Sequence, residues 1–141
     1  MNKPTHLQQR VMTHDEMQRL LKKYSHGRLG LAFQNEPYVV PVSYGYDQGR
    51  IFFHSVMQGK KVDFMKNNNK VCFEVDEWKK EWASVICYGT VTLRQDIEAW
   101  REFFEVLMGR KPSEEPGEIK TYIGIIQVED MTGRCSAGYS I

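Results

Sequence analysis

The sequence predicts an α+β domain that is mainly β, with six antiparallel strands in a barrel and helices at its periphery. The hydrophobic period changes from 3.6 to 2 after Gly27, and tight-turn sequences separate several of the period-2 segments. Strands joined by tight turns, with helices inserted between them, favour such a barrel. The 141 residues, 41% of them hydrophobic, amount to about one globular domain. We expect a single domain with residues 1–12 as a leader and residues 132–141 as a peripheral tail.

Three helices are predicted. Residues Thr13-His14-Asp15-Glu16 form a capping box, and the apolar residues behind it have helical spacing as far as Tyr24. A short helix is expected from Gly59 to about Asn67. Asp96 caps a third and stronger helix. The apolar stripe of that helix consists of Ile97, Trp100, Phe103, Phe104 and Leu107.

Six segments rich in β-branched and aromatic residues are predicted as strands. Turns are expected at Asn35-Glu36-Pro37 and at Asp47-Gln48-Gly49. Pro41 lies inside the second strand and has no amide hydrogen, so a bulge or an unpaired edge is expected there. The six segments are Leu29–Phe33, Tyr38–Tyr46, Arg50–Ser55, Val71–Val75, Ala83–Leu93 and Thr121–Val128.

The charge balance excludes several functional classes. Nineteen Lys and Arg against eighteen Asp and Glu give a net charge of +1, which argues against nucleic-acid or membrane-surface binding by bulk electrostatics. No run approaches the roughly 20 apolar residues of a membrane span. The first six residues lack the apolar segment and cleavage site of a secretory signal. We therefore expect a cytoplasmic protein without nucleic-acid or membrane partners.

Metal and hydrolase sites have no support in the sequence. The three cysteines, Cys72, Cys87 and Cys135, form no CxxC pair, and the first two are predicted to be small buried apolar residues. The four histidines are scattered, so no metal site is expected. No GxGxxG, HExxH or GxSxG motif occurs.

One segment, Phe52–Lys61, combines groups that suit a phosphate monoester. A strand delivers His54 and Ser55, and a short loop ends at Gly59, where Lys60 and Lys61 open a helix. A hydroxyl, backbone amides, a helix N-terminus and two ammonium groups together bind phosphate well. The alternative is a solvated helix start. The segment is not a nucleotide-binding P-loop, because Lys61 stands where Ser or Thr should bind magnesium.

With these segments the sequence resembles the FMN-binding split barrels of the pyridoxamine 5′-phosphate oxidase superfamily, and most closely the branch that contains nitroimidazole reductases. The resemblance extends over roughly residues 10–131 and follows the family order. It implies a six-stranded split barrel and a homodimer with two flavins at the interface. The matching segments are Gly27–Ala32, Pro37–Tyr46, Phe53–Lys61, Val71–Val75 and Ser84–Gly89.

The resemblance also implies which residues bind FMN. Backbone groups of Val40, Pro41, Val42 and Ser43 are expected along the flavin ring. The phosphate and ribityl chain are expected at His54, Ser55, Gly59, Lys60 and Lys61. A strand containing Ser84 and Val85 is expected to come from the partner subunit. His54 is the candidate for contact with the substrate or the flavin, and no residue is assigned as a catalytic acid. Trp78 and Trp82 either shelter the site or pack in the core or interface.

The predicted function is an FMN-dependent oxidoreductase that reduces a small organic acceptor, with a nitroaromatic such as a 5-nitroimidazole as the candidate. The tail contains a single arginine, Arg134, in place of the arginine-rich substrate motif of the true pyridoxamine phosphate oxidases. This departure argues against vitamin B6 oxidation. The alternative is a non-catalytic store or sensor that holds flavin, or haem with His54 as the first ligand candidate.

Overall fold

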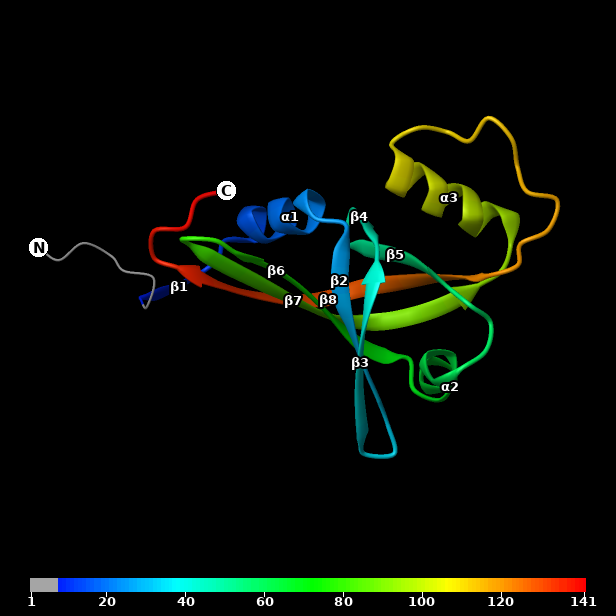
Figure 1. Cartoon of the computed structure of the whole chain (residues 1–141), viewed down its shortest axis with the longest axis horizontal. Coiled ribbons are helices and arrows are strands. Elements are labelled where there is room, and N and C mark those ends of the chain that lie inside the picture. Colours follow the sequence, from blue (N-terminus) through cyan, green and yellow to red (C-terminus); the bar gives the residue numbers. More distant parts are fainter. Residues whose placement is uncertain (1–7) are drawn as a thin grey trace, which may run out of the picture.

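A computed structural model of the chain describes residues 8–141. It contains a mixed set of long and short strands with three helices between them (Figure 1). The helices are α1 (His14–Lys23), α2 (Lys60–Asn67) and α3 (Ile97–Met108). The strands are β1 (Gln9–Val11), β2 (His26–Phe33), β3 (Glu36–Ser43), β4 (Gly45–Asp47), β5 (Arg50–Ser55), β6 (Lys70–Trp78), β7 (Trp82–Arg94) and β8 (Tyr122–Ser136).

All strands belong to one antiparallel sheet with the order β3-β2-β6-β7-β8-β5-β4, and β1 adds to β8. The sheet curls so that β3 approaches β5, yet the two strands are not hydrogen-bonded to each other. The barrel is therefore open along this seam. This confirms the predicted α+β, mainly β architecture of an antiparallel split barrel with peripheral helices, but the described residues form eight strands instead of six.

The second predicted strand, Tyr38–Tyr46, is divided in the structure. The chain leaves β3 at Tyr44 and re-enters the sheet as β4. Tyr44 is buried, its amide donates to the carbonyl of Ser25, and its hydroxyl donates to the carbonyl of Leu21 at 2.6 Å. These contacts fix the corner. The alternation of apolar and polar residues continues through the corner, so the sequence pattern did not predict the break.

Both expected turns connect adjacent strands. Gln34 and Asn35 join β2 to β3, and Gln48 and Gly49 join β4 to β5; all four have positive φ, as the favoured two-residue hairpin turns require. The first turn lies one residue before its predicted position. The pairing of β2 with β3 continues through Pro41 without a bulge, and β3 is the edge of the sheet, which is the second of the two predicted outcomes.

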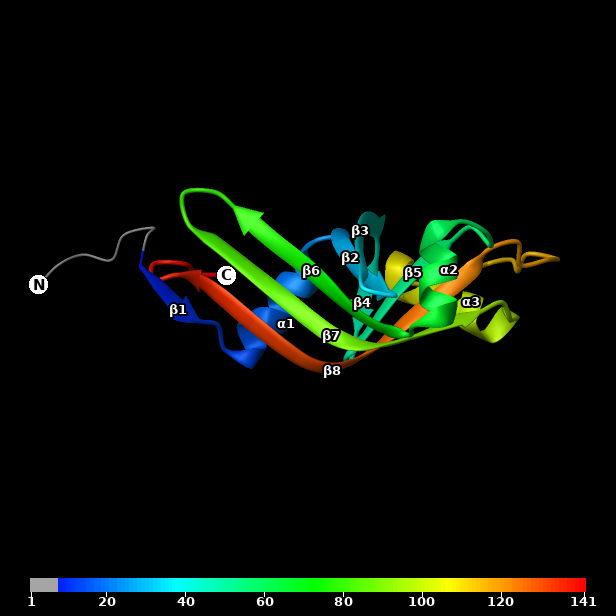
Figure 2. The ribbon, with the colours of Figure 1, turned by 90° about the horizontal axis from the view of Figure 1, so that it is seen from below.

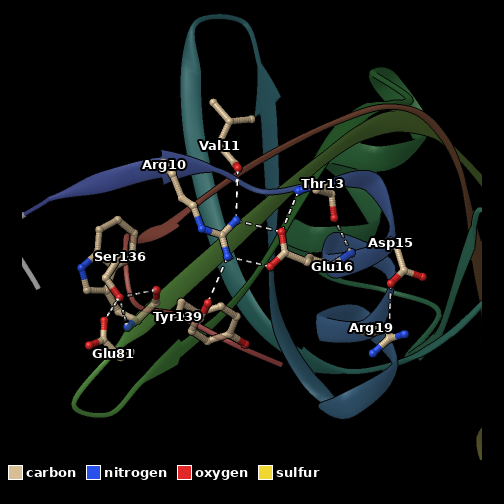
Figure 3. A network of polar contacts seen from close by, with 10 residues as sticks. Arg10, Val11, Thr13, Asp15, Glu16, Arg19, Glu81, Ser136 and Tyr139 are labelled. Atoms are coloured by element: carbon tan, nitrogen blue, oxygen red, sulfur yellow. Dashed lines mark hydrogen bonds and ion pairs between the residues drawn. The ribbon is translucent and has the colours of Figure 1, made fainter. Parts of the chain in front are cut away.

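The first and last segments of the described residues contribute more to the fold than expected (Figure 3). Residues Thr132–Ser136, predicted to be tail, continue β8 and pair with β7 and β1. The guanidinium of Arg10 donates to both carboxylate oxygens of Glu16 and to the carbonyl of Tyr139, whose side chain is buried. The predicted leader contributes β1, and its residues 1–7 lie outside the described residues.

The core lies on the inner face of the sheet, which α1 covers. Alternate residues of β6 and β7 point inward and are fully or nearly buried, among them Phe73, Val75 and Val85. Cys87 and Cys135 are buried and Cys72 is half-buried. A smaller cluster around Phe52 lies beneath α3. Among residues 8–141, no helix has the length and apolar character needed to cross a membrane.

Candidate functional site

The predicted flavin-binding segment of β3 lies along the open seam. β3 pairs with β2 on one side and with no described strand on the other side, so its outer backbone groups are available to a ligand. The side chains of Val40 and Val42 point toward the core, whereas Pro41 and Ser43 are exposed on the opposite face. The predicted backbone contacts are compatible with this arrangement.

The end of β5 faces the same seam. β3 and β5 are in contact across the seam, although the two strands are not hydrogen-bonded to each other. His54 is exposed, and its ring contacts Phe103 of α3 edge-on at 5.5 Å between centroids. Ser55 is buried, and its hydroxyl donates to the carbonyl of Val56 at 2.9 Å, so its oxygen can only accept a further hydrogen bond.

The start of α2 has an anion-binding character. Its N-cap is Gly59, with φ of 122°, and no side chain among residues 8–141 caps the amides of the first turn. Those amides have no partner within the helix. Lys61, in the same turn, is half-buried, forms no ion pair with any described residue, and has a pKa lowered by burial. Because a desolvated ammonium without a counter-charge is costly, this site favours an anion.

Lys60 is in a different environment. Its ammonium lies 2.8 Å from a carboxylate oxygen of Glu36, which raises its pKa. The same ammonium lies 4.7 Å from the ring centroid of Tyr38 and 5.5 Å from that of Phe64. Lys60 must leave Glu36 or share its charge to reach a phosphate. The Glu36 pairing had no sequence signal, since it joins residues on two separate elements.

Ser84 and Val85 have opposite orientations on β7. Val85 is fully buried in the core, so only its backbone is available to a ligand. Ser84 is on the outer face, opposite Asp76 of β6 and Arg134 of β8 in the register. β7 is not adjacent to the β3–β5 seam in the sheet order, so the structure does not bring Ser84 to the lysines of its own chain through strand pairing. This placement is compatible with the expectation that Ser84 serves the partner's site.

A large apolar hollow was not predicted from the sequence. It is a groove of about 750 Å³ on the outer face, lined by residues of β2, β3, β6, β7 and β8, including Gly30, Val39, Cys72 and Tyr88. None of the predicted site residues lines it. The only indication of the groove in the sequence is a pair of small residues, Gly30 and Ala32, at alternate positions of β2.

Comparison with known proteins identifies the family. The pyridoxamine 5′-phosphate oxidase family profile matches residues 13–135. The chain therefore belongs to this family, which confirms the resemblance noted in the sequence. An uncharacterised protein of Rhizobium meliloti strain 1021 is 28% identical over 149 residues, covering 90% of this chain and 95% of that protein.

Solved structures share the fold. A FAD-binding protein from Mesorhizobium loti is 28% identical, with a TM-score of 0.76 over 92% of this chain and 99% of its own. A protein from Bacteroides thetaiotaomicron, proposed to act in 5-nitroimidazole antibiotic resistance, is 20% identical, with a TM-score of 0.77 over 91% of this chain and 87% of its own. A FAD-binding protein from Mycobacterium smegmatis is 22% identical, with a TM-score of 0.71 over 90% of this chain and 98% of its own.

Proposed function

We propose that the protein is a flavin-dependent oxidoreductase that binds FMN in the β3–β5 seam. The observation that carries the proposal is the start of α2, where Lys61 is half-buried beside uncapped amides and forms no ion pair with the part of the chain that the structure describes. A phosphate monoester supplies the missing charge and accepts those amide hydrogens. Family membership and a relative described as FAD-binding support a flavin as the molecule that carries the phosphate.

The seam suits the rest of the cofactor. The unpaired edge of β3 from Val40 to Ser43 offers backbone hydrogen-bonding groups to a ring system with polar atoms along one side. The exposed imidazole of His54 stands at the end of β5 and is steadied by Phe103. When bound, a flavin supplies hydride and electron transfer. This chain's residues then hold the phosphate, orient the ring along β3, and present His54 to a small organic acceptor, with a nitroaromatic as the candidate.

Flavin titration of lysine variants tests the phosphate site. Hydrogen bonds to charged groups are worth about 1.5–3 kcal/mol each, so Lys61→Ala should weaken FMN binding by roughly 10–100-fold and Lys60→Ala/Lys61→Ala by at least about 100-fold. The control is Lys22→Ala, which removes an exposed cation of α1. An FMN affinity of the double variant within a few-fold of the parent would falsify the assignment.

We also propose that each site is shared between the subunits of a homodimer. Ser84→Trp should block the site that the partner's lysines hold, whereas the lysine double variant fails at its own site. A mixed dimer of the two variants contains one site with both defects and one intact site, so it should bind about one flavin. Folded mixed dimers that bind no flavin would place Ser84 beside the lysines of its own subunit.

Two measurements decide between the finer alternatives. Mass spectrometry of the released cofactor separates FMN from FAD, and an intense Soret band would indicate haem instead. Turnover of NAD(P)H with a nitroaromatic by the flavin-loaded protein separates an enzyme from a non-catalytic store or sensor. The cytoplasmic location stays a prediction from the sequence.

A further inference from the structure

The outer face of the sheet is partly apolar, and none of the helices in residues 8–141 covers it. Figure 2 shows β6, β7 and β8 from the side opposite α1. Of the seven most exposed large apolar side chains among the described residues, four are on this face by their register: Val11, Val39, Trp78 and Tyr88. Such a concentration on one face marks an interaction surface.

The apolar groove is a depression in this face with a simple structural cause. Val39, Gly30, Cys72 and Tyr88 are register partners in one row across β3, β2, β6 and β7. Gly30 has no side chain, and a Cβ atom there would lie 2.5 Å from the sulfur of Cys72. The side chains in the middle of this row therefore project little above the sheet. The surrounding residues, Glu129 among them, complete a groove of about 750 Å³.

An aromatic projection stands on the same face, at the other end of β6. Trp78 and Trp82 are register partners next to the β6–β7 turn, and their rings stack at 5.4 Å with an interplanar angle of 19°. The indole nitrogen of Trp78 donates to Asp76 at 3.0 Å, yet the residue is 68% exposed. An aromatic side chain held in one orientation and exposed is preorganised for a contact.

Groove and projection cannot meet within one chain. Cys72 and Trp78 are six residues apart on the same face of a strand, which is roughly 20 Å at about 3.3 Å per residue. Two copies related by a two-fold axis can bring the projection of each to the groove of the other. The axis then passes near the middle of β6, between Cys72 and Trp78.

The charges along this face suit the same arrangement. The centre of the face carries Arg28, 2.8 Å from both Glu74 and Asp76, and Arg134, which is two register steps from Asp76. These two cations and two carboxylates balance, so the middle of the interface carries no net charge. At the periphery, exposed Lys80 lies in the turn beside the projection, and the groove that receives it is lined by Glu129, whose carboxylate is 3.8 Å from the ammonium of Lys70.

We propose that the Trp78–Trp82 pair of one subunit inserts into the apolar groove of a second copy, and reciprocally. The contact rests on the homodimer proposed above, and it goes further by naming the residues that hold the two subunits together. The groove of each subunit is thus occupied by the aromatic tip of the β6–β7 hairpin of the other subunit, which contacts Cys72.

A cysteine cross-link tests the contact in the full-length protein. Trp78→Cys should form an intersubunit disulfide with the native Cys72 of the partner on oxidation with diamide, seen as a covalent dimer on a non-reducing gel. An intrachain disulfide is excluded by the separation along β6. The covalent dimer should disappear in Trp78→Cys/Cys72→Ser. The control is Met108→Cys, an exposed position on α3, which should not cross-link to Cys72.

Further variants measure the energetics of the contact without oxidation. Trp78→Ala should raise the dissociation constant of the dimer by about 30-fold or more, the range of an interface hot spot. Lys80→Glu and Glu129→Lys should each weaken the dimer, and the double variant should recover part of the loss. A dimer that forms normally but never cross-links through Cys72 overturns this contact and leaves the shared flavin site standing. A protein that is monomeric with and without FMN overturns both.

Discussion

The two faces of β6 shift the pKa of a carboxylic acid in opposite directions. Burial alone would raise the pKa of Glu77 on the inner face, but hydrogen bonds from Lys23 at 2.6 Å and Tyr24 at 2.5 Å lower it to about 2. On the outer face, burial is again the largest influence on Glu74, and together with the nearby Asp76 it raises the pKa despite the contact with Arg28.

The difference shows what each face is built for. The inner face surrounds the buried carboxylate of Glu77 with donors from Lys23, at the end of α1, and from Tyr24, which follows it. The outer face leaves Glu74 poorly compensated, Trp78 exposed and a groove open. These features suit a surface that is finished by a second molecule.

The largest expected effect tests the inner face. Phe73 is fully buried, packs edge-on against Tyr44 at 4.9 Å, and fills the space above Gly27. Phe73→Ala should lower the free energy of unfolding by about 3–5 kcal/mol, because it leaves a cavity. Denaturant melts at fixed protein concentration measure this, with the neighbouring outer-face variant Cys72→Ala as the control. Equal losses in the two variants would contradict the difference between the faces.

A smaller loss is expected at Gly89, where β7 and β8 are out of regular register. A Cβ atom there would lie 2.1 Å from the backbone oxygen of Gln127, which cannot move aside as a side chain would. Gly89→Ala should destabilise the protein by about 1–3 kcal/mol through overpacking. Gly117→Ala is the matched control, since nothing lies within 4 Å of its Cβ position. Thermal melts of the two variants should separate clearly.

The pH dependence of stability tests the donors around Glu77. Its pKa is about 2 in the folded chain and near 4.5 when unperturbed. Its stabilisation is therefore present above about pH 4.5 and is lost as pH falls toward 2. Glu77→Gln should cost about 1–3 kcal/mol at pH 7 and progressively less in acid. A variant whose stability deficit is the same at pH 7 and pH 3 would show that the carboxylate charge is unimportant.

The smallest change in stability is expected at Glu74 on the outer face, where the pH dependence has the opposite sign to that of Glu77. Because the folded pKa of Glu74 is raised, its ionisation costs stability as pH rises through that value. Glu74→Gln should therefore be neutral or stabilising by less than about 1 kcal/mol at pH 7, and the difference should vanish at pH 3. Urea melts at both pH values check this. A clear destabilisation at pH 7 would mean that Arg28 depends on Glu74 more than its partial exposure indicates.

The sequence was sufficient for the features that arise locally. The capping box at Thr13, the cap at Asp96, and the alternation in β6 and β7 all depend on nearby residues, and the structure confirms them. The corner at Tyr44 and the continuation of β8 through Thr132–Ser136 depend on contacts with Leu21 and with β1 and β7. No local pattern contains these contacts.

In the candidate site too, some features were predictable from nearby residues and others arise only from packing. The lysines at the start of α2 were visible as a motif, whereas the burial of Lys61 and the pairing of Lys60 with Glu36 come from the packing of α2 against β2 and β3. The orientation of Ser84 away from Val85 follows from strand alternation. The groove could not be predicted, because it is formed by residues that are neighbours only in the register of five strands.

The position of β8 has a consequence for how the chain folds during synthesis. β8 is the last described strand to leave the ribosome, and it pairs with β1, β5 and β7. Until it emerges, β7 and β5 have unpaired edges and the two parts of the sheet are not joined. Pairing between β1 and β8 closes a loop of more than a hundred residues, so folding is expected to be slow and to finish only after residue 136 is free. The nascent chain therefore needs protection from aggregation at these edges throughout its synthesis.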